Sequence, residues 1–264
     1  AGELAAFCGL DEHQLAPRAA DAFEILGLDK AENSTDAEDP DAPRPLLLAE
    51  IWPNRLRQPL TREALRSGLQ GGLWLLDANL DVDFPWQAND ALLIFKNGAT
   101  LNTFAKEGEI KITGCRLVSA VLDFQGACSI ALERCDWQGN YDPEAKRTVL
   151  HSDGQSLMVA DCNFSTRNAR VICVKNNNLI LKKNYFTHCG HAEIRGGAIC
   201  WMAGELKYGS WYPDGKFTAE IKESRFFNCI GESSAAIFMG QLQGISECEF
   251  VKCFATGQRG AKNI

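Results

Sequence analysis

Four polar residues in the middle of the chain have the types and the spacing that acid–base catalysis needs. Asp123, His151 and Lys175 recur at intervals of roughly two dozen residues, and Asp153 follows His151 by two positions. A base with a charge-stabilising group can cleave a polysaccharide by elimination, and paired acids can hydrolyse one. If the fold gathers them on one face, these four residues are the best candidates for catalysis.

A second set of residues offers ligand types suited to zinc, namely His188, Cys189, His191 and Cys200. They lack the paired CxxC spacing of structural zinc sites, and neighbours such as His188 and Cys189 should face opposite sides of a strand. We therefore interpret the two histidines as turn residues and expect neither a metal site nor a cofactor.

A register that repeats along the C-terminal half must position these side chains. Six segments superpose, each with a small residue, an aliphatic residue three positions before it and a large apolar residue two positions after it. The small residues are Cys115, Cys135, Cys162, Asn184, Ser224 and Cys248, and they lie 20, 27, 22, 40 and 24 positions apart. Such a spacing is typical of stacked coils rather than of separate helices or hairpins.

A second column repeats between these segments. One of its rows contains Leu122, Leu150, Ile172, Ile199 and Ile237, and the row two positions later contains Phe124, Ser152, Val174, Trp201 and Met239. Because side chains alternate along a strand, we expect both rows to point into the coil. The row between them should point outward, and it contains Asp123, His151, Cys173, Cys200 and Phe238. The interval of 40 positions leaves room for a long loop at about 203–217.

These columns predict an all-β protein, a right-handed parallel β-helix over residues 46–264. A short helix near 61–70, with Thr61 as its N-cap, should close the first coil. Residues 1–45 hold 11 acidic residues against 3 basic ones, which accounts for the formal net charge of −7. We expect this segment to be an acidic arm of short helices followed by an exposed linker.

The short helix, followed by strands that end in NGATL, resembles the opening of the right-handed pectate-lyase-like β-helix proteins. This resemblance covers roughly residues 46–264 and implies the fold. The NTD, paired DD, GHG and RIK motifs of that family do not occur in the sequence. The resemblance therefore implies no particular catalytic residue.

A narrower resemblance lies inside the repeats. Phe186-Thr187-His188-Cys189 is followed by Gly196-Gly197-Ala198-Ile199, and FFNC with SAAI and FVKC with GA repeat the pattern less completely. This pattern is similar to the FxxN and GGAI repeats of chlamydial polymorphic outer-membrane proteins, with cysteine in place of asparagine. The resemblance implies an adhesin-like passenger as one alternative function.

Composition narrows the possible partners and compartments. The chain lacks the basic stripe that nucleic-acid binding needs, and it lacks an apolar run of about 18 residues that could span a membrane. Its 11 cysteines are odd in number and show no paired spacing. We therefore favour reduced thiols in an intracellular or organellar compartment over a secreted protein.

Aromatic residues suggest how the chain is used. Tyr208, Trp211, Tyr212 and Phe217 lie in the long loop, beside an apolar flank that includes Met202 and Phe238. Such side chains are typical anchors of protein interfaces. We predict a non-catalytic β-helix module that binds a protein partner, within a larger protein or assembly. A carbohydrate-active enzyme that uses Asp123, His151, Asp153 and Lys175 on a polysaccharide is the first alternative, and an adhesin-like passenger is the second.

Overall fold

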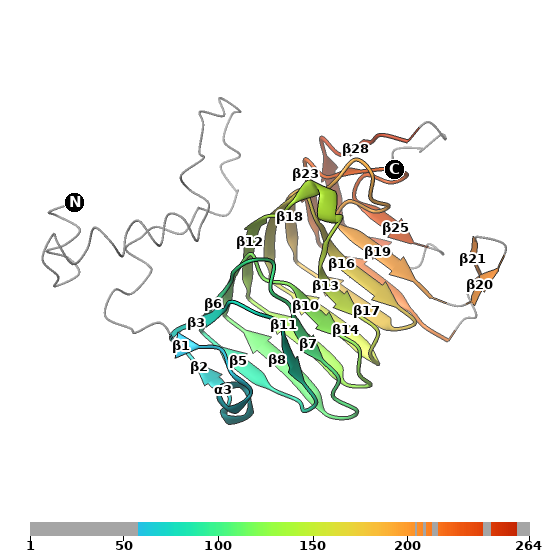
Figure 1. Ribbon diagram of the computed structural model, residues 1–264. Helices are drawn as coiled ribbons and strands as arrows, with labels where there is room; N and C mark the ends of the chain where they lie inside the picture. The colour runs from blue at the N-terminus through green and yellow to red at the C-terminus, as the bar shows by residue number, and fades with distance from the viewer. Residues whose placement is uncertain (1–57, 204, 208–209, 213–215, 240–243, 258–264) are drawn as a thin grey trace, which may run out of the picture. The chain divides into compact units, whose positions relative to one another are not determined.

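The computed structural model describes residues 58–203, 205–207, 210–212, 216–239 and 244–257 (Figure 1). For 205–207 and 210–212 it describes the backbone alone. The chain divides into two units, Ala1–Gln58 and Pro59–Ile264. The second unit is described below, and the predicted acidic arm over residues 1–45 lies outside the described residues.

Three sheets of parallel strands run through the second unit. Sheet A is, in spatial order, β1 (Gln58–Pro59), β3 (Leu73–Leu76), β6 (Leu92–Phe95), β9 (Arg116–Val118), β12 (Asp136–Asn140), β15 (Asn163–Arg167), β18 (Tyr185–Gly190), β23 (Arg225–Phe227) and β27 (Glu249–Val251), and β24 (Ile230–Gly231) pairs with β18 and β28 (Phe254–Ala255). Sheet B is β2 (Leu69–Gln70), β5 (Gln87–Asn89), β8 (Glu109–Thr113), β11 (Ser129–Glu133), β14 (Ser156–Ala160), β17 (Asn178–Lys182), β22 (Ala219–Lys222) and β26 (Ile245–Ser246). Sheet C is β4 (Leu80–Val82), β7 (Leu101–Thr103), β10 (Leu122–Phe124), β13 (Thr148–Ser152), β16 (Arg170–Lys175), β19 (Ile199–Met202) and β25 (Ile237–Met239).

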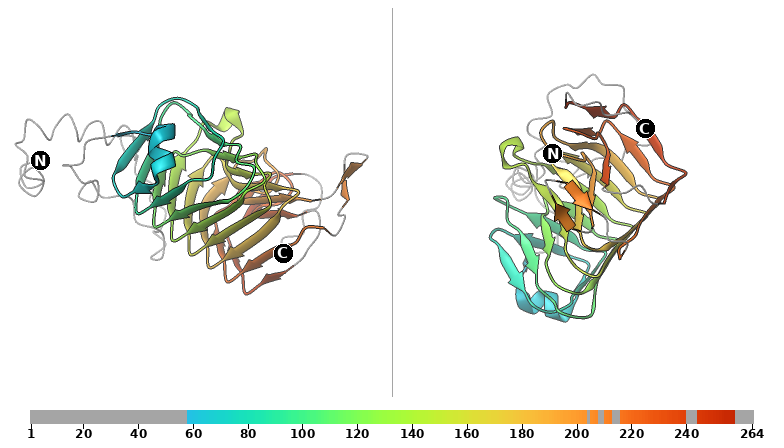
Figure 2. Two further views of the ribbon diagram at one scale, coloured as in Figure 1. Left: turned by 90° about the horizontal axis from the view of Figure 1, so that it is seen from below. Right: turned by 90° about the vertical axis from the view of Figure 1, so that its right-hand side faces the viewer.

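The chain passes from sheet B to sheet A to sheet C and then begins the next coil, as β8, β9 and β10 do before β11. Each strand pairs in parallel with the strand one coil away, so the coils stack as successive rungs (Figure 2). The predicted parallel β-helix is confirmed. A short 3-10 helix, η3 (Pro143–Ala145), lies in the connection between β12 and β13.

The predicted register is also confirmed, since like residues lie over like. In sheet A the large apolar residues of four coils stack through their rings. Ring centroids are 5.0 Å apart for Phe164 and Phe186, 4.8 Å for Phe186 and Phe226, and 4.8 Å for Phe226 and Phe250. Offset aromatic contacts of this kind stabilise a core beyond the area they bury.

The small residue of each repeat lies at the corner between sheet B and sheet A, where its side chain bonds the neighbouring coil. The backbone N–H of Cys162 donates to Asn184 Oδ1 at 3.0 Å, and that of Asn184 donates to Ser224 Oγ at 3.2 Å. Asn184 Nδ2 donates to the carbonyl of Val159 at 2.9 Å. The column is therefore a ladder that satisfies buried backbone groups of the corner.

The residue just before each small residue adopts the left-handed conformation, which turns the chain through the corner. These residues are Gly114, Arg134, Asp161, Lys183, Glu223 and Glu247, with φ between 50° and 62°. Of these positions only 114 is glycine, although a left-handed residue other than glycine costs about 1–2 kcal/mol. The buried ladder and the stacked rings must offset that cost.

The first coil is closed by helix α3 (Arg62–Ser67), in the place where the sequence predicts a short helix. The N–H of Ala64 donates to Thr61 Oγ1 at 3.2 Å, which makes Thr61 the N-cap. Leu65 is buried and joins the core of the stack. The helix thus covers apolar side chains of the first coil that a preceding coil would otherwise cover.

The long interval in the repeat contains a structure that the sequence did not predict. β20 (Glu205–Lys207) and β21 (Ser210–Tyr212) pair antiparallel and form a separate sheet. This hairpin projects from the end of β19 and stands away from the three sheets (Figures 1 and 2). The chain then returns to sheet B, where the N–H of Thr218 donates to Asn178 Oδ1 at 2.9 Å.

Candidate functional site

The outward row of sheet C brings together side chains that are far apart in sequence. Parallel pairing places seven residues one above another in the order Asp81, Asn102, Asp123, His151, Cys173, Cys200 and Phe238. Their neighbours along the central strands, such as Leu122 and Phe124, are fully buried in the core, whereas Leu80, Ile237 and Met239 at the two ends of the sheet are half-buried. The predicted outward row is therefore confirmed, and we call it the sheet C row.

Asp123 and His151 form the polar centre of this row. His151 Nδ1 lies 2.7 Å from Asp123 Oδ1, and Gln125 Nε2 donates to Asp123 Oδ2 at 2.6 Å. Burial would raise the pKa of Asp123, but the hydrogen bonds from His151 and Gln125 and the positive charges of His151 and Lys175 keep that pKa below its ordinary value. The carboxylate is therefore ionised at neutral pH and fixes the orientation of the imidazole.

The same contact acts on His151 in the opposite direction. The hydrogen bond to Asp123 raises the pKa of His151, although burial opposes the shift. The other ring nitrogen, Nε2, is buried and has no hydrogen-bond partner among the described residues. The imidazole thus holds a titrating nitrogen that is free to act on a neighbour.

That neighbour in the row is Cys173, which has only 4% of its surface exposed. A hydrogen bond from the Cys200 thiol lowers the pKa of Cys173 to about 6, against the effect of burial and with the help of Arg170, His151 and Lys175. The same hydrogen bond raises the pKa of Cys200. The pair therefore consists of one thiol that favours the thiolate and one that keeps its proton.

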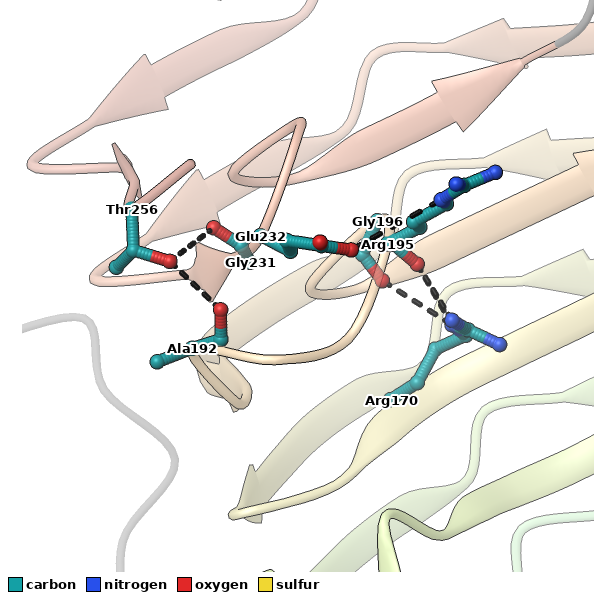
Figure 3. Close-up of polar contacts among 7 residues, drawn as sticks. All are labelled: Arg170, Ala192, Arg195, Gly196, Gly231, Glu232 and Thr256. Atoms are coloured by element: carbon teal, nitrogen blue, oxygen red, sulfur yellow. Dashed lines mark hydrogen bonds and ion pairs between the residues drawn. The ribbon is translucent and has the colours of Figure 1, made fainter. Parts of the chain in front are cut away.

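The guanidinium of Arg170, whose charge acts on both thiols, is fixed by backbone carbonyls (Figure 3). Arg170 Nε donates to the carbonyl oxygens of Arg195 at 3.0 Å and of Gly196 at 3.2 Å, and Nη1 donates to Thr148 Oγ1 at 3.4 Å. Carbonyl partners hold the side chain without neutralising its charge. Arg170 therefore supplies a fixed positive charge near the start of β16.

Of the four residues predicted for catalysis, the structure brings three into electrostatic contact. Asp123 and His151 are hydrogen-bonded, and the charge of Lys175 acts on both. Asp153 is exposed just after β13, where its backbone N–H donates to the carbonyl of Phe124 at 2.8 Å. Its carboxylate has no described partner in the row.

Cys173 and Cys200 lie in the outward row, as the sequence predicts, but the sequence assigns them no chemical role. Their position distinguishes them. Cys173 follows His151 in the row, and the charges of Arg170 and Lys175 act on its sulfur. A sequence shows that two cysteines share a row, but not that the charge of Arg170 acts on them. The position of that charge depends on the turn at Arg195 and Gly196.

The residue types of the row fit nucleophilic chemistry better than glycoside hydrolysis. An activated nucleophile needs an adjacent base and a third group that orients the base, and the register places Cys173, His151 and Asp123 next to one another in that order. His151 Nε2 makes no hydrogen bond to Cys173 in this structure. A glycoside hydrolase instead needs one carboxylic acid that keeps its proton, and the lowered pKa of Asp123 removes that role from it.

The residues predicted to contact a partner have different surroundings. Trp211 and Tyr212 belong to β21, whose backbone alone is described, and Tyr208 lies outside the described residues. Phe217 is partly buried and packs against the core. The remaining two, Met202 and Phe238, are half-buried at the C-terminal end of sheet C.

The histidine and cysteine residues considered for zinc are separated by the fold. His188 Nδ1 lies 2.9 Å from Thr187 Oγ1 and its Nε2 lies 3.2 Å from Asn228 Nδ2, whereas Cys189 is buried inside the coil. Among the described residues, no group of three or more histidine, cysteine or acidic side chains could hold a metal ion. In the same part of the chain, no helix is both long and apolar enough to cross a membrane.

Comparisons of the chain with protein-family models, with curated proteins and with solved structures give no match. The assignment to the parallel β-helix fold therefore rests on the strand register of the chain itself.

Proposed function

We propose that this chain is a non-catalytic β-helix module that binds a protein partner through the hairpin of β20 and β21. The observation that supports this most directly is the hairpin itself, an antiparallel pair outside the three parallel sheets. A two-stranded hairpin in water is at best marginally stable unless it packs against something else. A partner that packs against it would stabilise both the hairpin and the complex.

The residue types of the hairpin and its surroundings favour a protein partner. Trp211 and Tyr212 lie on β21, and tryptophan and tyrosine are enriched among the residues that dominate interface energies. Met202 ends β19, three positions before the hairpin begins, and Phe238 lies opposite Cys200 on the adjacent strand. The hairpin and this half-buried flank would form one continuous contact surface.

The proposal also includes a structural relationship to the pectate-lyase-like β-helix proteins. The opening helix and the NGATL segment support a right-handed β-helix of the pectate-lyase-like kind, in which a solenoid serves as a rigid support for projecting loops. The backbone groups of the three sheets are already paired between coils, which agrees with a scaffold role within a larger protein or assembly. Specificity for the partner would then reside in the hairpin of β20 and β21.

The test removes the hairpin and leaves the solenoid unchanged. Proteins captured by the intact chain are purified, and their dissociation constants are measured for the intact chain, for a chain lacking residues 204–216, and for Trp211→Ala. Phe104→Ala, which changes an exposed aromatic residue of the solenoid, is the matched control. We expect binding to weaken roughly tenfold or more for the first two variants and to stay unchanged for the control. Equal affinity for all the chains would overturn the proposal.

A carbohydrate-active enzyme is the second candidate, because one observation favours it. Asp123 and His151 are hydrogen-bonded on an outward sheet face, the place where extended sugar chains could lie. Acidic polysaccharides incubated with the intact chain and with the Asp123→Ala, Asp153→Ala double variant test this candidate. Turnover that disappears in the variant would replace the binding proposal with an enzymatic one.

A further inference from the structure

We propose that Cys173 and Cys200 form a dithiol site that reacts with hydrogen peroxide or a small hydroperoxide, with Cys173 as the nucleophile and Cys200 as the resolving thiol. This inference goes beyond the proposed binding function and does not depend on it. It rests on the geometry of the sheet C row and on the charges fixed around it.

The strand pairing places the two cysteines directly opposite each other, one coil apart. Cys173 in β16 lies opposite Cys200 in β19, and both side chains leave the same face of sheet C. Neighbouring strands lie about 4.8 Å apart, within the Cα separations that a disulfide tolerates. Parallel strands direct the Cβ atoms poorly for this bond, so the disulfide should be strained and easily reduced.

The charges around the pair favour a thiolate at Cys173. Arg170, His151 and Lys175 all act on its sulfur, and Arg195 acts together with Arg170 on Cys200. The carboxylate of Asp123 faces His151, and the register places His151 between Asp123 and Cys173. Within the row, the Asp123 carboxylate therefore positions the imidazole, and His151 separates it from the thiolate.

The other stacked cysteines belong to the hydrophobic core or pack against it, whereas Cys173 and Cys200 do not. A hydrogen bond with Cys229 also lowers the pKa of Cys253, to about 7, but neither of these thiols lies beside a histidine or lysine of the sheet C row.

Cys135 and Cys162 are also one coil apart, but their thiols donate to the carbonyls of Glu133 at 3.4 Å and of Ala160 at 3.2 Å. The hydrogen bond with Cys162 and burial raise the pKa of Cys135 far above its ordinary value. This corner pair shares the spacing of the sheet C pair without its positive charges, and so provides an internal control.

Limited exposure restricts the substrate to a small molecule. Cys173 and Cys200 have 4% and 2% of their surfaces exposed. A bulky acyl or thiol compound would have to displace the neighbouring side chains, whereas hydrogen peroxide is about as small as two water molecules. The site therefore suits a peroxide better than a larger electrophile.

The reaction balances in two steps. The Cys173 thiolate attacks one peroxide oxygen, the O–O bond breaks, and the leaving hydroxide takes a proton from the His151 imidazolium to form water. Sulfur is oxidised to a sulfenic acid by two electrons, and the peroxide is reduced. Cys200 then attacks that sulfur; the S–S bond forms, the S–O bond breaks, and the departing hydroxide leaves as water with the Cys200 proton. An external dithiol restores both thiols by exchange.

The experiment uses the full reduced chain with one equivalent of hydrogen peroxide at pH 7. Trypsin releases Cys173 in the peptide 171–175 and Cys200 in the peptide 196–207, and each peptide holds a single cysteine. We expect a disulfide between these two peptides, formed roughly tenfold faster than any oxidation of Cys135 or Cys162, because thiolate content sets the rate. Dithiothreitol should reverse it.

Variants separate the roles of the residues. Cys200→Ser should leave a sulfenic acid on 171–175 that dimedone traps, and Asp123→Asn should slow the reaction and shift its pH profile. Cys135→Ser is the control and should not change the rate. The proposal is overturned if the two peptides do not become linked in the unaltered chain, or if the corner pair oxidises at the same rate. That readout needs no variant to fold.

Discussion

Substitution of Asp123 is the simplest test of whether the side chains of the sheet C row contact one another. Because its hydrogen bond raises the pKa of His151, Asp123→Asn should lower that pKa toward or below its ordinary value. An NMR titration of the imidazole resonances measures the change. Asp153→Asn is the control, since that carboxylate is exposed and outside the row. An unchanged His151 titration in Asp123→Asn would show that the two side chains do not meet.

The same contact has a consequence for stability that depends on pH. The pKa of His151 is raised in the folded state, so its contribution is present below about pH 6.5 and is lost as pH rises through the raised value. The pKa of Asp123 is lowered, so its contribution is present above about pH 4 and is lost as pH falls through the lowered value. The pair therefore stabilises the fold most between these limits.

At the scale of the element, the corner ladder depends on side chains that accept a backbone N–H. Asn184→Ala would leave the N–H of Cys162 and the carbonyl of Val159 without their partner. We expect a loss of about 2–4 kcal/mol in the free energy of unfolding, measured by urea denaturation. Asn184→Cys is the matched variant, because cysteine occupies this position in other coils, and it should cost clearly less. Equal losses for both variants would mean that the corner needs only a particular volume.

The stacked rings of sheet A make a second prediction for the elements. Phe186 is fully buried, with its ring between those of Phe164 and Phe226. Phe186→Ala should destabilise the chain by about 3–5 kcal/mol, through lost burial and the cavity that remains. Ile180→Ala, at an outward position of β17 that is 44% exposed, should cost less than about 1 kcal/mol. Comparable costs would contradict the assignment of inward and outward faces.

For the whole molecule, the repeat could be predicted because its determinants are local and periodic. Cys135 and Cys162 share a corner, and Trp137 lies opposite Phe164, as the aligned segments predict. Alternation along the strand then separates the inward Leu150 from the outward His151. A solenoid repeats one interaction many times, so a single chain contains enough information to determine its register.

The features that could not be predicted depend on segments that interrupt the repeat. The hairpin of β20 and β21 falls in the long interval, where the coil pattern gives no register to extend. The guanidinium of Arg170 is held by two carbonyls of the turn at Arg195 and Gly196 (Figure 3). Such contacts arise from the path of one loop, which composition and spacing do not encode.

The central claim is that stacking of coils makes one site from residues far apart in the chain, and a double-mutant cycle tests it most directly. Unfolding free energies are measured at pH 6 and pH 9 for the unaltered chain, Asp123→Asn, His151→Asn and the double variant. We expect a coupling energy of about 1–2 kcal/mol at pH 6 and a smaller one at pH 9, because His151 then loses its charge. Additive effects at pH 6, within about 0.3 kcal/mol, would contradict the claim.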